Sequence, residues 1–178
     1  MTIRSQGDIS AFSELVATRS PALLRTAYLV VGDRQLAHDL LQEALVKTYV
    51  AWPRLRDVAK AEAYVRRTMV TTAISWRRRR SFHERPVEVV PEVWQVDPSE
   101  QLASHDDVWS QVCGLPSRQR AVLVLRYYED LSYADIAAVL GCSMGTVASQ
   151  VSEALNTLRQ RISPESAALL PDDEAVTR

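Results

Sequence analysis

The sequence predicts an all-α protein with two small helical domains, the second of which ends in a helix-turn-helix. Hydrophobic residues make up 47% of the 178 residues, which is enough for a packed core. Only 5 residues are glycine, while Ala, Leu, Val and Arg are abundant, and this composition favours helix over sheet. An acidic segment with three prolines at residues 86–99 separates the two helical stretches, and we expect it to be a linker.

Residues 1–31 are expected to form the first two of four helices in a domain at residues 1–85. A short helix at residues 9–18 has one apolar side. The serine–proline pair that follows combines an N-cap with a first-turn proline. We therefore predict a helix break before Pro21. Gly32 ends the second helix, because glycine accepts a left-handed backbone.

The third and fourth helices of this domain are expected at residues 34–51 and 61–80. Asp33 precedes the third helix as an N-cap. Trp52 and Pro53 follow it, and proline interrupts a helix because it lacks an N–H group. We therefore predict a loop at residues 54–60.

The second domain is expected at residues 100–163. It would contain a helix near residues 100–113, a helix at residues 118–129 that Ser117 caps, and a helix-turn-helix. An acidic tail follows at residues 164–178, and we expect it to be frayed.

Residues 131–155 have the spacing of a helix-turn-helix. Ser132 and Asp135 form a capping box at the start of its first helix. Gly141 stands where that helix needs a left-handed residue to end, and Ser143 caps the second helix. The seam between the two helices would consist of Ile136, Ala137, Leu140, Val147 and Val151. Such a second helix can lie in the major groove of DNA; an ordinary helical hairpin inside a core is the alternative.

Arginine and aromatic residues alternate along the helix expected at residues 61–80. The basic positions are Arg66, Arg67 and the run at residues 77–80, and the aromatic positions are Tyr64 and Trp76. Arginine holds phosphates by paired hydrogen bonds, and aromatic rings stack on unpaired bases. The combination predicts binding of single-stranded or melted nucleic acid. The alternative is a solvated basic face, with Trp76 buried as a core anchor.

The formal net charge of −1 conceals a basic first half. Residues 1–85 contain 15 Lys and Arg against 8 Asp and Glu, whereas residues 86–110 contain six acids and no base. A polyanionic partner would meet this local positive charge. On the helix at residues 34–51, Asp39, Gln42 and Glu43 share a face that could dock a partner protein. The pattern alone favours a solvent-facing strip there.

No motif predicts catalysis, a cofactor or a metal site. His38 and its acidic neighbours lack the Glu-x-x-His pairs of a metal-binding helical bundle, and no glycine loop could hold phosphate. Cys113 and Cys142 have no metal-type spacing. With no signal peptide and no apolar run of about 18 residues, we expect a cytoplasmic protein without membrane insertion and without enzyme activity.

Over about residues 9–162 the chain resembles the extracytoplasmic-function sigma factors. It is most similar to their actinobacterial type, which carries Ser-Pro-Ala-Leu-Leu-Arg-Thr-Ala-Tyr-Leu near its start. The matching motifs, in the order of the family, occupy residues 20–29, 32–37, 39–45, 63–67, 75–80, 115–128 and 131–146. So many ordered matches are not expected by chance.

The resemblance implies a transcription initiation factor that binds the clamp helices and flap of core RNA polymerase and directs it to promoters. The polymerase-binding residues would be Asp39, Leu40, Gln42 and Glu43. The melted −10 element would be read by Trp52, Arg54, Arg56, Arg66, Arg67, Thr71, Trp76, Arg77 and Arg78. One base would be flipped into a protein pocket, where new contacts offset the cost of unstacking.

The resemblance also implies that the second helix of the helix-turn-helix enters the major groove at the −35 element. Its DNA-binding residues would be Ser143, Thr146, Ala148, Ser149, Gln150 and Glu153. Relatives often have Lys in place of Ala148, Arg in place of Glu153 and Asn in place of Thr71. We therefore expect −35 binding to be weaker by about 1–3 kcal/mol, and the −10 preference to differ.

The acidic linker at residues 86–99 would thread toward the RNA exit channel as a displaceable mimic of nucleic acid. Whether an anti-sigma factor binds stays open. Two rival interpretations also stay open. One is a conventional regulator that binds paired half-sites as a dimer. The other is an adaptor whose helix-turn-helix has lost its DNA affinity, which Ala148 and Glu153 favour.

Overall fold

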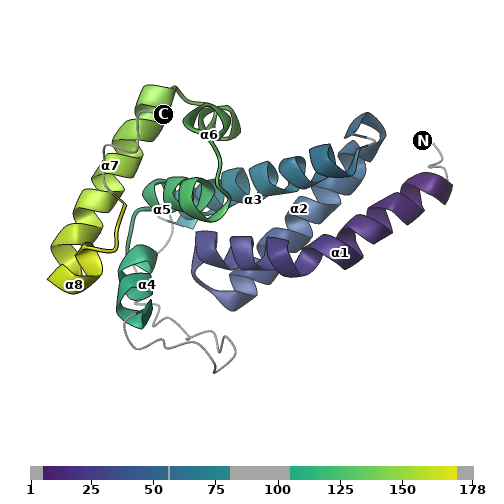
Figure 1. The fold of residues 1–178 in the computed structure, drawn as a ribbon. Helices are drawn as coiled ribbons and strands as arrows, with labels where there is room; N and C mark the ends of the chain where they lie inside the picture. The colour runs from purple at the N-terminus through teal and green to yellow at the C-terminus, as the bar shows by residue number, and fades with distance from the viewer. Residues whose placement is uncertain (1–5, 56, 81–104, 172–178) are drawn as a thin grey trace. The chain divides into compact units, whose positions relative to one another are not determined.

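The computed structural model describes residues 6–55, 57–80 and 105–171, and the regular structure in these ranges is helical (Figure 1). The chain divides into two compact units, Met1–Arg85 and Pro86–Arg178. The predicted all-α fold with two helical units is therefore confirmed. The segment predicted to be a linker, residues 86–99, lies outside the described residues and stays a prediction.

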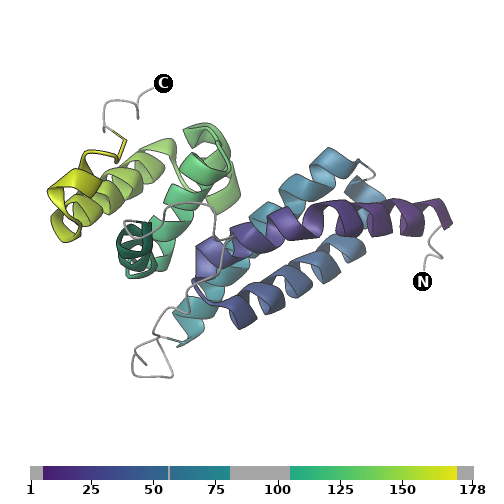
Figure 2. The same cartoon turned by 60° about the horizontal axis from the view of Figure 1, so that its bottom comes forward.

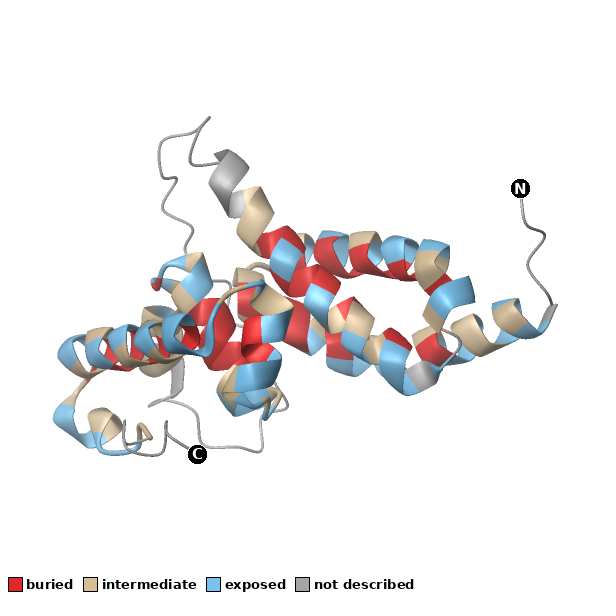
Figure 3. Cartoon of the chain, turned by 90° about the horizontal axis from the view of Figure 1, so that it is seen from above, coloured by how far each residue is buried: buried red, intermediate tan, exposed pale blue. Residues whose placement is uncertain are grey.

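Over residues 6–55 and 57–80 the first unit consists of three long helices, where the sequence predicted four. They are α1 (Gln6–Val31), α2 (Arg34–Leu55) and α3 (Val58–Arg80). Each helix contacts the other two, and Figures 1 and 2 show them side by side. Figure 3 shows the buried residues between the helices. The largest fully buried side chains of this unit are Leu15, Leu23, Leu40, Val65, Met69 and Val70.

Helix α1 continues through Pro21, so the predicted break at this proline is wrong. A proline inside a helix costs about 3 kcal/mol. Leu15 and Leu23 stand on either side of it, and both are 0% exposed. Burying one leucine contributes roughly 1.5–3 kcal/mol, and a continuous helix places both leucines on its inner side. Packing against α2 and α3 therefore outweighs the local cost of the proline.

The turn between α1 and α2 has the predicted geometry. Gly32 has a φ of 76°, and its N–H donates to the carbonyl of Tyr28 at 2.7 Å. The Asp33 carboxylate accepts a hydrogen bond from the N–H of Leu36 at 2.7 Å. Both signals concern backbone groups a few residues away, which is why the sequence alone revealed them.

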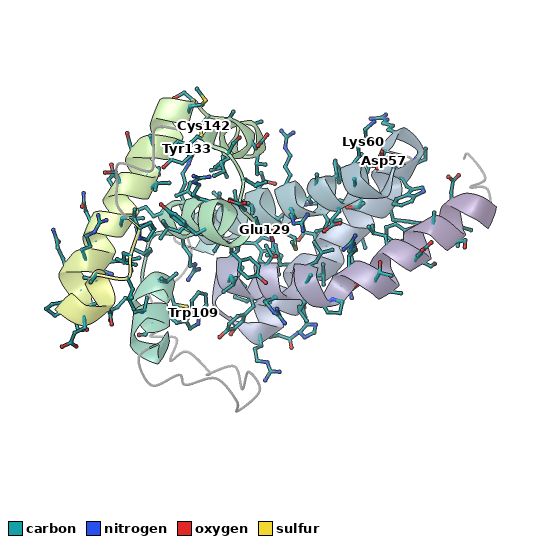
Figure 4. The ribbon with its side chains drawn as sticks, viewed as in Figure 1. Asp57, Lys60, Trp109, Glu129, Tyr133 and Cys142 are labelled. Carbon is teal, nitrogen blue, oxygen red and sulfur yellow. The ribbon has the colours of Figure 1, made fainter. Side chains whose placement is uncertain are left out.

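The turn between α2 and α3 is shorter than predicted. Helix α2 continues through Pro53, and α3 begins directly after Asp57, so the predicted loop at residues 54–60 is wrong. The Asp57 carboxylate accepts hydrogen bonds from the N–H groups of Ala59 at 2.8 Å and Lys60 at 3.3 Å. Figure 4 shows Asp57 and Lys60 together at this turn. An aspartate cap thus starts α3 three residues before the expected position.

The second unit contains shorter helices. They are α4 (His105–Cys113), α5 (Ser117–Leu123), a π-helix η1 (Val124–Tyr128), α6 (Tyr133–Leu140), α7 (Met144–Arg161) and α8 (Pro164–Ala167). The predicted cap by Ser117 is wrong, because Pro116 takes the N-cap position of α5 and no side chain caps it. The largest fully buried side chains are Leu115, Val122, Leu125, Ile136, Leu155 and Leu158.

The start of the C-terminal segment is structured, which corrects the expectation of a frayed tail from residue 164 onward. Ser163 caps α8 by accepting the N–H of Ser166 at 3.2 Å. The Arg159 guanidinium donates from Nη2 to the carbonyl of Pro171 at 2.6 Å. These contacts attach residues 163–171 to the end of α7. Residues 172–178 lie outside the described part of the chain.

In the described ranges no single helix is long and apolar enough to cross a membrane, and only the bent pair α6 and α7 passes that test of length and composition together. Cys113 and Cys142 are free cysteines. No group of three or more potential metal ligands occurs among the residues that the structure describes.

Candidate polymerase and nucleic-acid interfaces

Helix α2 exposes a face that mixes polar and apolar side chains, which we call the α2 face. It consists of Gln35, Asp39, Gln42, Val46 and Val50, spaced three or four residues apart. Val46 and Val50 are 62% and 68% exposed although they are apolar. They extend the predicted pair Asp39 and Gln42 by two turns. Neither valine stood out in the sequence, because a lone valine there fits equally well at the edge of a core stripe.

Leu40 does not belong to this face. It was predicted to bind polymerase together with Asp39, but it is 0% exposed and lies in the core. Successive residues of a helix point about 100° apart, so the neighbour of an exposed residue can be fully buried. Leu40 therefore positions α2 within the bundle and is not available for a direct contact with a partner.

A polar bridge connects α2 to α3. The Lys47 ammonium lies 2.5 Å from Oε1 of Glu43 and donates to Oγ1 of Thr72 at 3.2 Å. Thr72 is buried on α3, directly after the predicted DNA-contact residue Thr71. Glu43 is half-buried, so this part of the predicted polymerase-binding set is engaged within the bundle. Of these two contacts, the Lys47–Thr72 hydrogen bond connects α2 to α3.

Helix α3 exposes a basic stripe, which we call the α3 stripe. It consists of Lys60, Ala63, Arg67 and Thr71. Thr71 donates its hydroxyl proton to the carbonyl of Arg67 at 2.9 Å, so its oxygen still has acceptor capacity toward solvent. Arg77 and Arg78 continue the helix, but their side chains lie outside the described ones. Lys60 was expected in a loop, and it lies instead in the first turn of α3.

Arg66 differs from its neighbour Arg67. Its Nη2 atom lies 2.7 Å from Oε1 of Glu62, and Oε2 of the same carboxylate lies 3.2 Å from Nε of Arg19 on α1. The side chain of Glu62 is only 14% exposed. One carboxylate thus holds two guanidinium groups across the α1–α3 contact. Arg66 is fixed beside the α3 stripe, whereas Arg67 is exposed on it.

The remaining residues predicted for the −10 element have different environments. Trp52 is 2% exposed, and its ring meets that of Phe12 edge-on at 5.3 Å between centroids. It is a core residue, so we withdraw a direct contact of Trp52 with DNA. Arg54 is exposed and Trp76 is half-buried. Arg56 lies outside the described residues.

The second unit contains the predicted helix-turn-helix. Ser132 accepts the N–H of Asp135 at 3.1 Å, and Ser143 accepts the N–H of Thr146 at 3.1 Å. Gly141 has the predicted left-handed conformation, with φ of 64°. Helices α6 and α7 meet at 102°, within the range of DNA-binding motifs of this kind. Figure 4 shows Cys142 at the turn between them.

The first turns of α7 expose polar side chains, which we call the α7 face. It consists of Ser143, Thr146, Ser149 and Glu153, with Ala148 and Gln150 half-buried beside it. One carboxylate oxygen, Oε2 of Glu153, accepts from Nε2 of Gln119 at 3.2 Å and from Nε2 of Gln150 at 3.3 Å. Gln119 lies on α5, 34 residues earlier in the chain. No local signal could have paired it with Glu153.

Arg126 and Tyr133 form a further contact that the sequence did not reveal. The Arg126 guanidinium lies 5.5 Å from the centroid of the Tyr133 ring and donates to the carbonyl of Leu131 at 3.1 Å. This contact places positive charge beside the N-terminus of α6, where the helix dipole is also positive. The Asp135 carboxylate lies in the first turn of the same helix and accepts from the Ser132 hydroxyl, so this helix start already carries a negative group.

A bundle with a basic stripe and a separate helix-turn-helix unit together define a two-module DNA-binding protein. The sigma-70 region 2 family model matches residues 15–83, and the sigma-70 region 4 model matches residues 105–158. The RNA polymerase sigma-E factor of Streptomyces coelicolor is 42% identical over 88% of both chains. That of Streptomyces antibioticus is 41% identical over 89% of this chain and 88% of its own length.

The chain therefore belongs to the sigma-70 family of RNA polymerase sigma factors, and within it to the extracytoplasmic-function type. It is a transcription initiation factor that acts at specific promoters. Among solved structures, the sigma factor RpoE of Bartonella quintana, crystallised with the anti-sigma factor NepR, has a similar fold. The TM-score is 0.67 at 24% identity, covering 84% of this chain and 94% of that one.

Proposed function

We propose that three surfaces of this sigma factor each bind a different partner. The α2 face docks on core RNA polymerase, the α3 stripe reads the melted −10 element, and the α7 face reads the −35 duplex. The observation that carries the proposal is the placement of these surfaces on rigid helices whose inner sides are fully buried. Each surface is thus presented in a fixed geometry, without rearrangement of the helix that bears it.

The α2 face suits a protein partner better than nucleic acid. Val46 and Val50 offer apolar area that a partner helix can cover, and Asp39 and Gln42 beside them supply hydrogen-bonding groups. A carboxylate at this place would repel DNA phosphates. The proposed polymerase contacts are therefore Asp39, Gln42, Val46 and Val50, with Leu40 in the core beneath them and Glu43 paired with Lys47 beside them.

The α3 stripe suits single-stranded DNA. Arg67 and Lys60 are exposed and can bind phosphates. The Thr71 hydroxyl oxygen can accept a hydrogen bond from a base. Arg66, held by Glu62, contributes charge from the edge of the stripe. Arg54, Trp76, Arg77 and Arg78 complete the proposed −10 set.

The α7 face suits duplex DNA. The N-terminal part of such a helix contacts base edges, and the preceding helix crosses the backbone. Thr146, Ser149 and Gln150 offer donors and acceptors for base edges, with Ala148 placed for an apolar contact. The chain acts by binding alone in this proposal, without a catalytic step, and its place of action on bacterial promoters is the cytoplasm.

The test is run-off transcription with core bacterial RNA polymerase that lacks a sigma factor, on the DNA upstream of the gene for this chain. We expect a discrete transcript that depends on the protein. Val46→Asp with Val50→Asp should abolish binding to core polymerase in a pull-down, whereas Arg67→Glu should keep that binding and lose the transcript. All three residues are exposed, so the variants should fold.

The paired outcomes separate the proposal from its rivals. Polymerase binding that survives the double valine change would reject the α2 face as the docking surface. A chain that binds duplex DNA as a dimer and ignores core polymerase would instead be a conventional regulator.

A further inference from the structure

The Glu153 carboxylate is held in one orientation by two amide groups. Both Gln119 and Gln150 donate to the same oxygen, Oε2, at 3.2 and 3.3 Å. Among the described residues no hydrogen bond reaches the other oxygen, Oε1, and the side chain is exposed. The two amides therefore satisfy the inner oxygen and leave the outer one as a free acceptor. We propose that Glu153 reads a cytosine of the −35 duplex through this outer oxygen.

The position of Glu153 on α7 fits such a contact. Thr146, Ser149 and Glu153 are exposed at intervals of three and four residues, so they form one line along the helix. Seven residues of helix span about 10 Å, which is similar to the roughly 12 Å width of the major groove. The inference rests on the proposed docking of the α7 face in that groove.

The chemistry of the base edges favours cytosine. A carboxylate only accepts hydrogen bonds, and the N4 amine of cytosine is a donor in the major groove. Guanine presents two acceptors there and thymine presents one, so both would repel Oε1. Adenine has a donor at N6 but an acceptor at N7 beside it. We therefore expect the preference cytosine, then adenine, then guanine and thymine.

Gln119 acts in this scheme as a positioning residue. Its amide oxygen is buried without a hydrogen-bond partner among the described residues, so its bond to Glu153 defines how the amide is turned. Turning the amide over would bring its oxygen against the carboxylate. The hydrogen bond from Gln119 on α5 thus limits the movement of Glu153 away from the groove. Without it, repulsion between the carboxylate and the DNA phosphates would favour that movement.

The experiment measures base preference with full-length protein bound to core polymerase. A promoter library randomised at the −35 element is selected with the wild type, with Glu153→Ala and with Glu165→Ala. Glu165 is exposed on α8, and its replacement removes the same charge away from the α7 face. We expect the wild type and Glu165→Ala to select cytosine at one position. The preference of Glu153→Ala for cytosine at that position should be about 5- to 20-fold lower.

Two further measurements sharpen the result. The selected cytosine can be replaced by 2-pyrimidinone, which lacks the amine. This replacement should weaken DNA binding by the wild type and leave DNA binding by Glu153→Ala unchanged. Gln119→Leu should reduce the preference for cytosine while Glu153 is still present.

The possible failures are distinguishable. If Glu153→Ala binds all four bases more tightly by the same factor, the carboxylate only repels phosphates, and the inference is wrong although the −35 docking stands. If the wild type selects no base at any −35 position, the proposed docking of α7 fails as well.

Discussion

Helices α3 and α7 are both proposed to bind DNA, but they carry opposite kinds of surface. Helix α3 contains seven basic residues and one acid. Helix α7 has a single charged residue before Arg159, and that residue is the acid Glu153. The α3 stripe can therefore hold a flexible, melted strand by charge, whereas the α7 face must rely on hydrogen bonds to base edges. Charge gives affinity for any sequence, and hydrogen bonds give discrimination.

The same contrast appears in how the side chains are held. On α3 the Glu62 carboxylate binds Arg19 and Arg66, so an acid restrains two bases. On α7 two neutral amides restrain an acid. In each unit one residue of the proposed DNA-binding set, Arg66 on α3 and Glu153 on α7, has a partner that limits its motion. Such restraint lowers the entropy cost of binding.

The largest expected effect tests the distinction between buried and exposed residues of α2. Leu40→Ala should lower the free energy of unfolding by about 2–5 kcal/mol, because it removes a fully buried side chain and leaves a cavity. Asp39→Ala should change this quantity little, because Asp39 is exposed, and should weaken polymerase binding instead. Urea unfolding followed by circular dichroism measures the first effect, and a pull-down with core polymerase measures the second. Equal stability of the two variants would contradict the burial of Leu40.

The next effect concerns the charge of the α3 stripe. Arg67→Ala should weaken binding of polymerase holoenzyme to melted −10 DNA by about 1.5–3 kcal/mol, the range for hydrogen bonds to charged groups. It should also lower the slope of log K against log salt by about 0.7, the value for one phosphate of a single strand. Binding titrations at several salt concentrations provide both numbers.

Ala148→Lys on α7 is the counterpart to the change at Arg67. It adds a charge to a helix that has none in its first turns. The slope of log K against log salt for −35 binding should therefore become steeper by about 0.9. Ser149→Ala is the neutral control, since it leaves the charge unchanged. A steeper slope for Ser149→Ala as well would rule out phosphate contact as the cause.

The smallest expected effect is the loss of a helix N-cap, which can be compared between α7 and α3. Ser143→Ala removes the cap of α7 and should cost about 1 kcal/mol of stability in the second unit. Asp57→Ala should cost a similar amount in the first unit, because Asp57 caps α3 in the same way. Thermal unfolding resolved by unit through hydrogen exchange measures each loss. A loss that appears in the other unit would contradict the division at residue 85.

Local signals predicted much of the helical structure. The Asp33 and Ser143 caps and the left-handed Gly141 were recognisable because each involves backbone groups only a few residues away. The Ser117 cap failed for the opposite reason, since Pro116 holds the N-cap position and the serine is already helical. Capping residues thus indicate where a helix begins to within about one residue, as is usual for helix ends.

The candidate sites were predictable in outline only. Composition and motif order pointed to α2, α3 and α7 as the interacting helices. Leu40 and Trp52 were assigned to binding sites because of the segments in which they lie, yet both are buried. Val46 and Val50 were overlooked, although they are among the most exposed apolar residues of the first unit. A motif identifies a binding segment, whereas the packing of the helix determines which residues of that segment are exposed to a partner.

The amino-acid sequence by itself determined the all-α class, the Asp33, Ser132 and Ser143 caps, the helix-turn-helix and the family, because these depend on neighbouring residues and on helical spacing. Only the tertiary structure decided that α1 runs through Pro21, that Trp52 belongs to the core and that Gln119 restrains Glu153. Each of these outcomes depends on groups far apart in the chain. Their energies arise when helices pack together, so they exist only in the folded molecule.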